Sequence, residues 1–178
     1  MPAARSQEDA LVVGSAQGVW EDLRAASALL ARPTIFAVNL MVLFLPSVDH
    51  AVSHHGEALV HLVAHRRCNV ELSAVVRATP PVTHSSQPAA GIDRIWRELR
   101  AGDSGLLATR VALALGFERV VLAGVQINAM LNLYSDPYGP QFDFGTHYRH
   151  VWEGYVHEFA GRVTSMSGYT RGLLGAPA

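Results

Sequence analysis

The feature that most constrains the fold is a repeated alternation of short apolar segments with segments of helical pattern. The clearest unit is SGLLATRVALALGFERVVLAGVQ, which runs from Ser104 to Gln126. Apolar residues recur at helical spacing through its first half, Gly116 ends that helix, and residues 119–123 follow as a buried strand. Alternating helices and strands predict an α/β fold, a single three-layer Rossmann-like domain with a mostly parallel sheet.

The same patterns predict the other elements of this domain, which we expect to span residues 1–178. Predicted strands are 10–13, 34–38, 48–53, 68–76, 119–123 and 162–166. Predicted helices are 17–31, 56–65, 92–100, 104–116 and 147–161, with Asp103 or Ser104 as the N-cap of the fourth. We expect a loose polar lead over 1–9, a Pro/Ser-rich surface loop over 78–91 and a loop over 132–146.

The charge pattern limits the classes of ligand. The chain has 178 residues and a net charge of −1, so it has no basic surface typical of nucleic-acid binding. All 14 of its cationic residues are arginines, and a chain without lysine cannot have a Walker A loop or form a Schiff base. An anionic ligand must therefore be held by arginine, backbone N–H groups or helix dipoles.

Cysteine content and apolar runs indicate the compartment. Cys68 is the only cysteine, which excludes an internal disulfide and favours a reducing compartment. The first ten residues contain no apolar segment typical of a signal peptide. The most apolar stretch, 35–45, is shorter than the roughly 20 residues that span a bilayer. We therefore expect a cytoplasmic protein without a membrane span.

The candidate binding residues follow the predicted strands or begin the predicted helices. In open α/β sheets, ligands bind at the carboxyl ends of the strands, where the strand order reverses. GSAQG at 14–18 is a strand-to-helix turn whose N–H groups suit a phosphate, and Ser104-Gly105 begins a second helix with the same property. The predicted nucleotide-binding residues are Gly14, Ser15, Gly18, Asn39, His54, Ser104, Gly105 and Gln126. A plain strand-to-helix turn at 14–18 is the alternative.

Histidines are the candidate catalytic groups. His61 and His65 have the i, i+4 spacing of HLVAH, but the zincin motif needs a glutamate where this chain has Leu62, so no metal site is expected. His147 and His150 follow a loop rich in acidic and aromatic residues, and either is a candidate general base. A solvated helix start is the alternative for both.

The chain resembles a Rossmann-like superfamily in the order of four features. These are GSxxG after the first strand, Asn39 after the second, a strand that ends at His54, and then the 104–126 unit. This superfamily includes bacterial sialyltransferases of the lipooligosaccharide type and archaeal 6-hydroxymethylpterin pyrophosphokinases. The ending RVTSMSGYTRGLLGAP is similar to phage- or prophage-encoded members. The resemblance implies a nucleotide at Gly14-Ser15, Asn39 and Ser104-Gly105, and a late histidine, His147 or His150, as general base. Gln126 stands where members often have Asp, and the segment after it is short for an acceptor-binding lid.

The function predicted from these features is nucleotide-dependent group transfer, foremost glycosyl transfer from a nucleotide sugar. One alternative is a non-catalytic nucleotide- or small-ligand-binding protein of the phage accessory type. The other is diphosphoryl transfer, for which Mg²⁺ would be the expected cofactor. The expected partner is a nucleotide or nucleotide-sugar donor, and association of like chains stays open.

Overall fold

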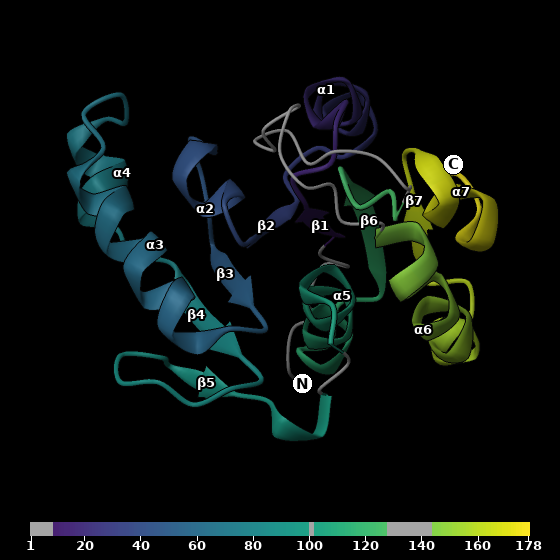
Figure 1. The fold of residues 1–178 in the computed structure, drawn as a ribbon. Coiled ribbons are helices and arrows are strands. Elements are labelled where there is room, and N and C mark those ends of the chain that lie inside the picture. Colours follow the sequence, from purple (N-terminus) through teal and green to yellow (C-terminus); the bar gives the residue numbers. More distant parts are fainter. Residues whose placement is uncertain (1–8, 100–101, 128–143) are drawn as a thin grey trace, which may run out of the picture.

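The computed structural model describes residues 9–99, 102–127 and 144–178. Within them, one sheet of seven parallel strands has the order β5-β4-β3-β2-β1-β6-β7 (Figure 1). The strands are β1 (Asp9–Val13), β2 (Thr34–Val38), β3 (His50–Ser53), β4 (Val82–Ser85), β5 (Arg94–Ile95), β6 (Arg119–Ala123) and β7 (Val163–Ser165). This confirms the predicted α/β fold with a parallel sheet.

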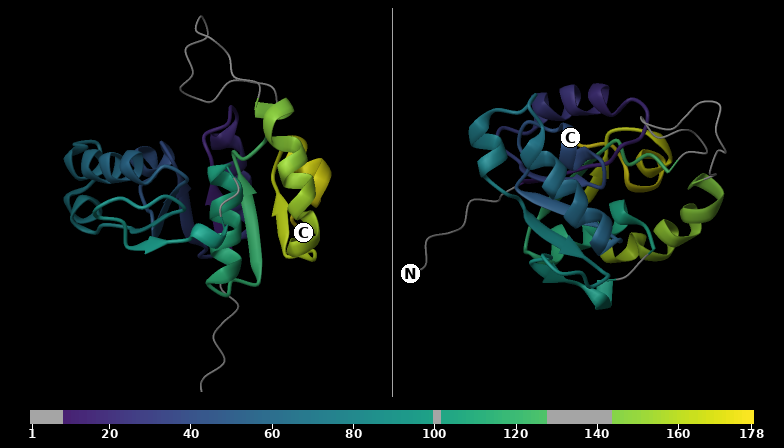
Figure 2. Two further views of the ribbon diagram at one scale, coloured as in Figure 1. Left: turned by 60° about the horizontal axis from the view of Figure 1, so that its bottom comes forward. Right: turned by 60° about the vertical axis from the view of Figure 1, so that its left-hand side comes forward.

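Helices cover both faces of the sheet, so that α1 and α5 lie on opposite sides of it (Figures 1 and 2). The α-helices are α1 (Val19–Leu29), α2 (Met41–Phe44), α3 (Gly56–Cys68), α4 (Ala74–Ala78), α5 (Ser104–Ala114), α6 (Phe144–Phe159) and α7 (Gly168–Leu174). A 3₁₀ turn, η1, covers Arg97–Leu99. No helix in the described ranges has the length and apolar character needed to cross a membrane.

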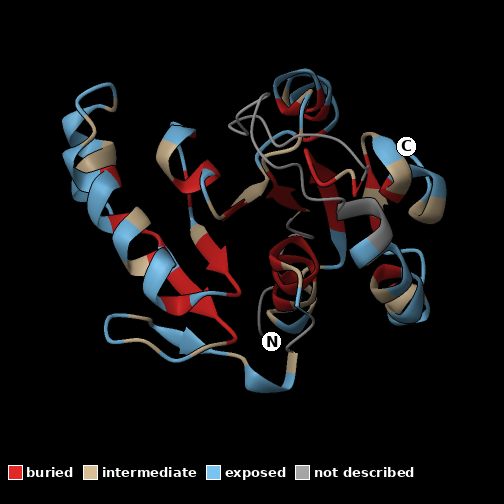
Figure 3. Ribbon diagram, in the orientation of Figure 1, coloured by how far each residue is buried: buried red, intermediate tan, exposed pale blue. Residues whose placement is uncertain are grey.

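Alternating residues of each strand point to opposite faces, and each face has its own apolar core. In β1, Ala10 and Val12 pack with α5 and α6, whereas Leu11 and Val13 pack with α1, α2 and α3. Apart from the exposed β5, the strands are mostly buried, as is the inner side of α5, while the outer sides of α3 and α4 face solvent (Figure 3). A sheet covered on both faces explains why its strands are continuous apolar runs.

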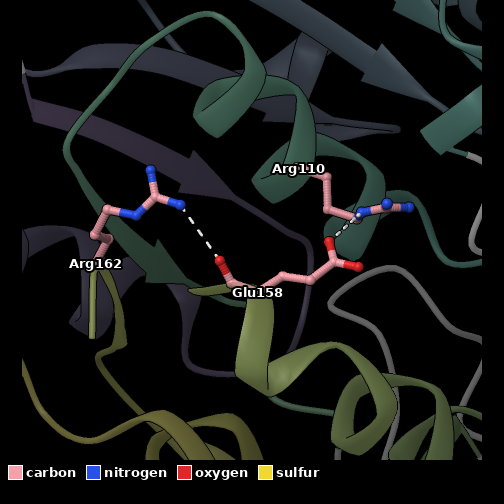
Figure 4. A network of polar contacts seen from close by, with 3 residues as sticks. All are labelled: Arg110, Glu158 and Arg162. Atoms are coloured by element: carbon pink, nitrogen blue, oxygen red, sulfur yellow. Dashed lines mark hydrogen bonds and ion pairs between the residues drawn. The ribbon is translucent and has the colours of Figure 1, made fainter. Parts of the chain in front are cut away.

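The C-terminal end of α6 is held to two neighbouring elements by polar contacts (Figure 4). Arg110 of α5 donates from Nε to Glu158 Oε2 at 3.3 Å, and its guanidinium also lies 4.4 Å from the centre of the Tyr155 ring. Arg162, just before β7, donates to the Glu158 carbonyl oxygen at 3.3 Å. These contacts fix the C-terminal end of α6 against α5 and the start of β7.

Two predicted elements are wrong. The predicted surface loop 78–91 contains β4, whose residues 83–85 are fully buried between β3 and β5. The predicted strand 68–76 is instead the end of α3, a turn and the start of α4. Its β-branched residues Val70 and Val75 are 79% and 76% exposed, so no sheet face covers them.

The remaining differences concern short elements. The predicted helix 92–100 contains β5 and η1 instead, and α2 and α7 were not predicted. The predicted helices 17–31, 56–65, 104–116 and 147–161 correspond to α1, α3, α5 and α6, and strands β2 and β6 have the predicted bounds. The expected lead over 1–9 and the expected loop over 132–146 lie almost wholly outside the described residues.

Candidate functional site

The candidate site lies at the carboxyl ends of β1 and β6, where the strand order reverses. The chain moves outward from β1 through β2, β3 and β4 to β5, then returns to place β6 on the other side of β1. The connections after β1 and β6 therefore leave the sheet toward opposite faces. This divergence is the usual position of a ligand crevice in open α/β sheets.

Two glycines let the connections after β1 and β6 approach each other closely. A Cβ atom on Gly14 would lie 2.5 Å from the Gly124 carbonyl oxygen, which no side chain can occupy. The Gly14 N–H donates to the Ala123 oxygen at 2.9 Å, and the Ala16 N–H donates to the Gly124 oxygen at 2.9 Å. Gly14 is thus required by backbone packing, independently of any ligand.

A buried carboxylate joins three elements beneath this crossing. Asp22 of α1 is 7% exposed, and its Oδ2 accepts from the Gly124 N–H at 2.9 Å and from the Ser167 hydroxyl at 2.5 Å. Gln126 donates from Nε2 to Ser167 Oγ at 2.9 Å and to the Gln17 carbonyl oxygen at 2.8 Å. The predicted ligand residue Gln126 therefore joins the loop after β1 to the start of α7.

Ser15, Asn39 and Gly18 lie at the ends of the adjacent strands β1 and β2. The side chains of Ser15 and Asn39 are half-buried, and no hydrogen bond joins either to the described part of the chain. Asn39 has a φ of 50°, a left-handed conformation that asparagine tolerates better than most residues. Gly18, with φ 87°, is the N-cap of α1, and no side chain caps that helix start. These groups have donors and acceptors available to a ligand.

His54 follows β3 and is held by a group of serines. Its Nδ1 lies 2.5 Å from Ser86 Oγ, and its backbone N–H donates to Ser104 Oγ at 2.9 Å. Its Nε2 lies 3.4 Å from Gln87 Nε2, and the side chain is 8% exposed. These contacts fix the orientation of the imidazole at the carboxyl end of the sheet. The sequence did not identify Ser86 and Gln87 as partners of His54, because both lie in a segment that was predicted to be a surface loop.

At the start of α5, the structure confirms one of the two expected N-caps. Asp103 caps the helix, since its Oδ1 accepts from the Leu106 N–H at 2.6 Å, whereas Ser104 bonds to His54. Burial raises the pKa of the Asp103 carboxyl, and N–H bonds from Leu106 and Gly105 oppose that rise. A cap by Ser104 is therefore wrong. The Asp103 carboxyl group occupies the helix start that was expected to receive a phosphate.

Gly105 also has a packing role. A Cβ atom there would lie 2.8 Å from Val125 Cγ1 and 3.1 Å from Asp103 Oδ1. The close contact between α5 and the loop after β6 thus explains the glycine without a ligand. Assignment of Ser104 and Gly105 to ligand binding stays a prediction.

His147 and His150 lie near the start of α6 and are both exposed. The His147 ring packs edge-on against Tyr148, with 4.6 Å between the ring centres. Burial raises the pKa of the Tyr148 hydroxyl, and the nearby Asp103 charge adds to the rise. A Cβ atom on Gly102 would lie 4.0 Å from Tyr148 Cε1, so this end of α6 lies beside the start of α5. The catalytic role of the two histidines stays a prediction.

Arg149 is a cation at this edge that the sequence analysis missed. It donates from Nε to the Ile127 carbonyl oxygen at 3.4 Å, just beyond β6. Its guanidinium carbon lies 4.7 Å from the centre of the Tyr169 ring of α7. Nothing in the sequence around Arg149 distinguishes it from any other exposed helical arginine. Its position depends on Tyr169, which lies 20 residues later.

The described residues contain no cluster of three or more histidine, cysteine or acidic side chains that could hold a metal ion. His61 and His65 of α3 are exposed. No family model, curated protein or solved structure matches this chain. The family resemblance therefore stays a prediction.

Proposed function

We propose that the carboxyl edge beside β1 and β2 binds a nucleotide or nucleotide sugar. The observation that carries the proposal is the set of groups left available there: the Ser15 hydroxyl, the Asn39 amide and the uncapped start of α1. They follow two strands that pair directly, and β1 is also one of the two strands at which the strand order reverses, where open α/β sheets hold their ligands.

The chemistry of these groups suits a phosphorylated ligand. Free N–H groups at a helix start attract anions, and a hydroxyl and an amide both donate hydrogen bonds to phosphate oxygens. Glu21 in the first turn of α1 would oppose an anion, but it forms an ion pair with Arg24 at 3.4 Å. Half-buried amide and hydroxyl groups also suit a ribose or a base edge, which favours a nucleotide over inorganic phosphate.

Group transfer is the activity proposed for the bound nucleotide. In glycosyl transfer, an acceptor hydroxyl oxygen bonds to the anomeric carbon while the bond from that carbon to the phosphate oxygen breaks. The leaving electron pair stays on the nucleotide phosphate, and the acceptor proton passes to a base. His147 or His150 is the proposed base, since a neutral imidazole accepts a proton near pH 7.

The exposure of both histidines favours a second candidate, ligand binding without catalysis. A general base has to reach its acceptor within a site that excludes bulk water. Diphosphoryl transfer has less support, because Asp22 and Asp103 already accept backbone N–H groups and are poorly placed to share an Mg²⁺.

The first experiment is a thermal-shift screen with CMP, CMP-sugars, UDP, GDP, ATP and pterins. A ligand at 100 times its Kd stabilises the fold by about 2.7 kcal/mol. Asn39→Gly removes the amide and suits the positive φ, so the fold should persist while ligand affinity falls. Ser15→Ala tests the hydroxyl, with Ser47→Ala, at an exposed position before β3, as its matched control.

Stabilisation by none of these ligands would contradict the proposal, as would equal affinity of wild type, Asn39→Gly and Ser15→Ala. With a donor identified, single-turnover rates separate the two candidates. Loss of rate in His147→Ala or His150→Ala supports transfer. A wild type that binds the donor and never transfers it supports binding alone.

A further inference from the structure

Two contacts position the exposed Arg149 side chain on the protein surface. Its guanidinium lies over the Tyr169 ring, and its Nε bonds to the Ile127 carbonyl oxygen. Tyr169 is fixed in turn, because its backbone N–H donates to the Gln126 carbonyl oxygen at 3.0 Å. An arginine whose rotamers are already restricted loses less entropy when it binds a ligand.

This arginine lies at the same edge as the proposed nucleotide site. Gln126 and Ile127 follow β6, which pairs with β1 along its whole length. The Gln126 side chain also bonds to the Gln17 carbonyl oxygen in the loop that contains Ser15. Arg149 is therefore held beside the loop after β6, one strand from the loop after β1.

Among the described residues, no carboxylate lies within ion-pair distance of Arg149. Arg24, Arg110 and Arg119 each pair with a carboxylate there, but Arg149 does not. Glu153, one helical turn further along α6, is at the spacing of an ion-pair partner, yet it accepts the Tyr169 hydroxyl. Tyr169 thus both supports the guanidinium and occupies the nearest carboxylate on the helix.

We propose that Arg149 binds the phosphate group of the nucleotide, and that Tyr169 and Glu153 position it for this role. The inference rests on the proposed function, of which it names the anion-binding residue. A guanidinium offers a planar pair of N–H donors that matches two phosphate oxygens. In a chain without lysine, an arginine positioned at the ligand edge, with no ion-pair partner among the described residues, is the residue suited to this task.

The test compares charged and uncharged ligands on the full chain. CDP, UDP, GDP and ADP are titrated beside their nucleosides, with inorganic pyrophosphate as a probe that has no base. We expect Arg149→Gln to weaken diphosphate and pyrophosphate binding by roughly tenfold to a hundredfold, the value of one or two charged hydrogen bonds. Nucleoside affinity should stay unchanged. Arg171→Gln, on α7, is the control, because its guanidinium bonds to the Met166 carbonyl oxygen.

Two further variants separate phosphate binding from a structural role of the stack. Tyr169→Phe keeps the ring under Arg149 but releases Glu153, which can then pair with Arg149. We expect this variant to lose diphosphate affinity, and the double variant Tyr169→Phe/Glu153→Gln to recover it. A purely structural role predicts no such recovery, and predicts equal losses for diphosphate and nucleoside.

The outcomes distinguish the two proposals. Wild-type binding of a diphosphate with unchanged affinity in Arg149→Gln overturns the role of Arg149 and leaves the nucleotide site standing. Parallel loss of nucleoside and diphosphate affinity also overturns it. A wild type that binds none of the nucleotides overturns the proposed function, and the role of Arg149 with it.

Discussion

His50 Nδ1 and His84 Nε2 lie 2.9 Å apart, in a hydrogen bond that joins β3 to β4. The indole N–H of Trp96 donates to His84 Nδ1 at 3.0 Å, so that nitrogen has no proton. His84 Nε2 must then have the proton and donate it to His50. The Phe36 ring stacks on His50 with 4.4 Å between ring centres. Both imidazoles are thus fixed as neutral tautomers, away from the candidate site.

This pair predicts a loss of stability in acid. Burial, with smaller contributions from the neighbouring His50 and Arg94, lowers the pKa of His84 to about 3, while Asp93 opposes the shift. Burial also lowers the pKa of His50, with Asp49 raising it and Arg94 lowering it. The unfolded chain takes up these protons near pH 6.5 and the folded chain does not. The free energy of unfolding should therefore be greatest above pH 6.5 and fall as the pH drops toward 3.

Urea unfolding at several pH values between 7 and 4 measures this effect. His84→Gln keeps an acceptor for Trp96 and a donor for His50 but cannot titrate. Its free energy of unfolding should fall less steeply with acidification, by up to about 1.4 kcal/mol per pH unit. His61→Gln, at an exposed position of α3, should retain the wild-type slope. Equal slopes in wild type and His84→Gln would contradict the assignment.

The cap of α5 gives a second prediction. Asp103→Ala removes the acceptor for the Leu106 N–H and should lower the free energy of unfolding by about 1 kcal/mol. Asp103→Asn keeps a capping oxygen without a charge. Because the pKa of Asp103 is raised in the fold, the charged form is disfavoured there, and Asp103→Asn should be at least as stable as wild type at pH 7. Thermal unfolding of both variants is the measurement.

Two glycines on helices should respond oppositely to alanine. A Cβ at Gly105 would meet Val125, so Gly105→Ala should destabilise the fold by roughly 1–3 kcal/mol. Nothing lies within 4 Å of a Cβ at Gly154 in α6, so Gly154→Ala should stabilise it by up to about 1 kcal/mol through helix propensity. Denaturant midpoints compare the two. An unchanged denaturant midpoint in Gly105→Ala would contradict the packing role and favour the predicted role of Gly105 in ligand binding.

Asp22 bonds to the loop after β6, and its neighbour Glu21 provides a control for substituting it. Asp22→Ala leaves the buried Gly124 N–H without its acceptor, which should cost roughly 1–3 kcal/mol. Glu21 is exposed and pairs only with Arg24, so Glu21→Ala should change stability by less than about 0.5 kcal/mol. Similar losses in both variants would remove the special role of Asp22.

The sequence predicted the strands whose buried residues are all apolar. After its first residue, Thr34 or Arg119, each of the strands β2 and β6 is an apolar run, so their bounds needed no knowledge of neighbouring strands. Strand β4 was missed because its buried residues are polar: the Thr83 N–H bonds to Asp93, and His84 bonds to His50 and Trp96. His50 is distant from β4 in the sequence, and Asp93 and Trp96 lie in a segment that was predicted to be a helix. No local sequence pattern therefore indicates that these residues bond to β4.

The sequence predicted where the candidate site lies, but not which contacts its residues make. Strand ends identified Ser15, Asn39 and His54, because any parallel sheet brings such residues to one edge. The roles of Gln126 and Ser104 depend on Ser167 and His54, which are 41 and 50 residues away in the sequence. Arg149 likewise depends on Tyr169. Sequence patterns identify which residues reach the edge, but not which of them the protein itself uses.

The place of β1 between β2 and β6 has a consequence for the newly made chain. Strand β6 follows so late that Asp9 and Arg119, which pair at 2.6 Å, are 110 residues apart. At about 5–20 residues per second, translation leaves one side of β1 bare for roughly 5–20 s. An unpaired apolar strand is a template for pairing with other chains. On the ribosome, a strand that ends inside the finished sheet is therefore an edge open to pairing with other chains, until β6 docks.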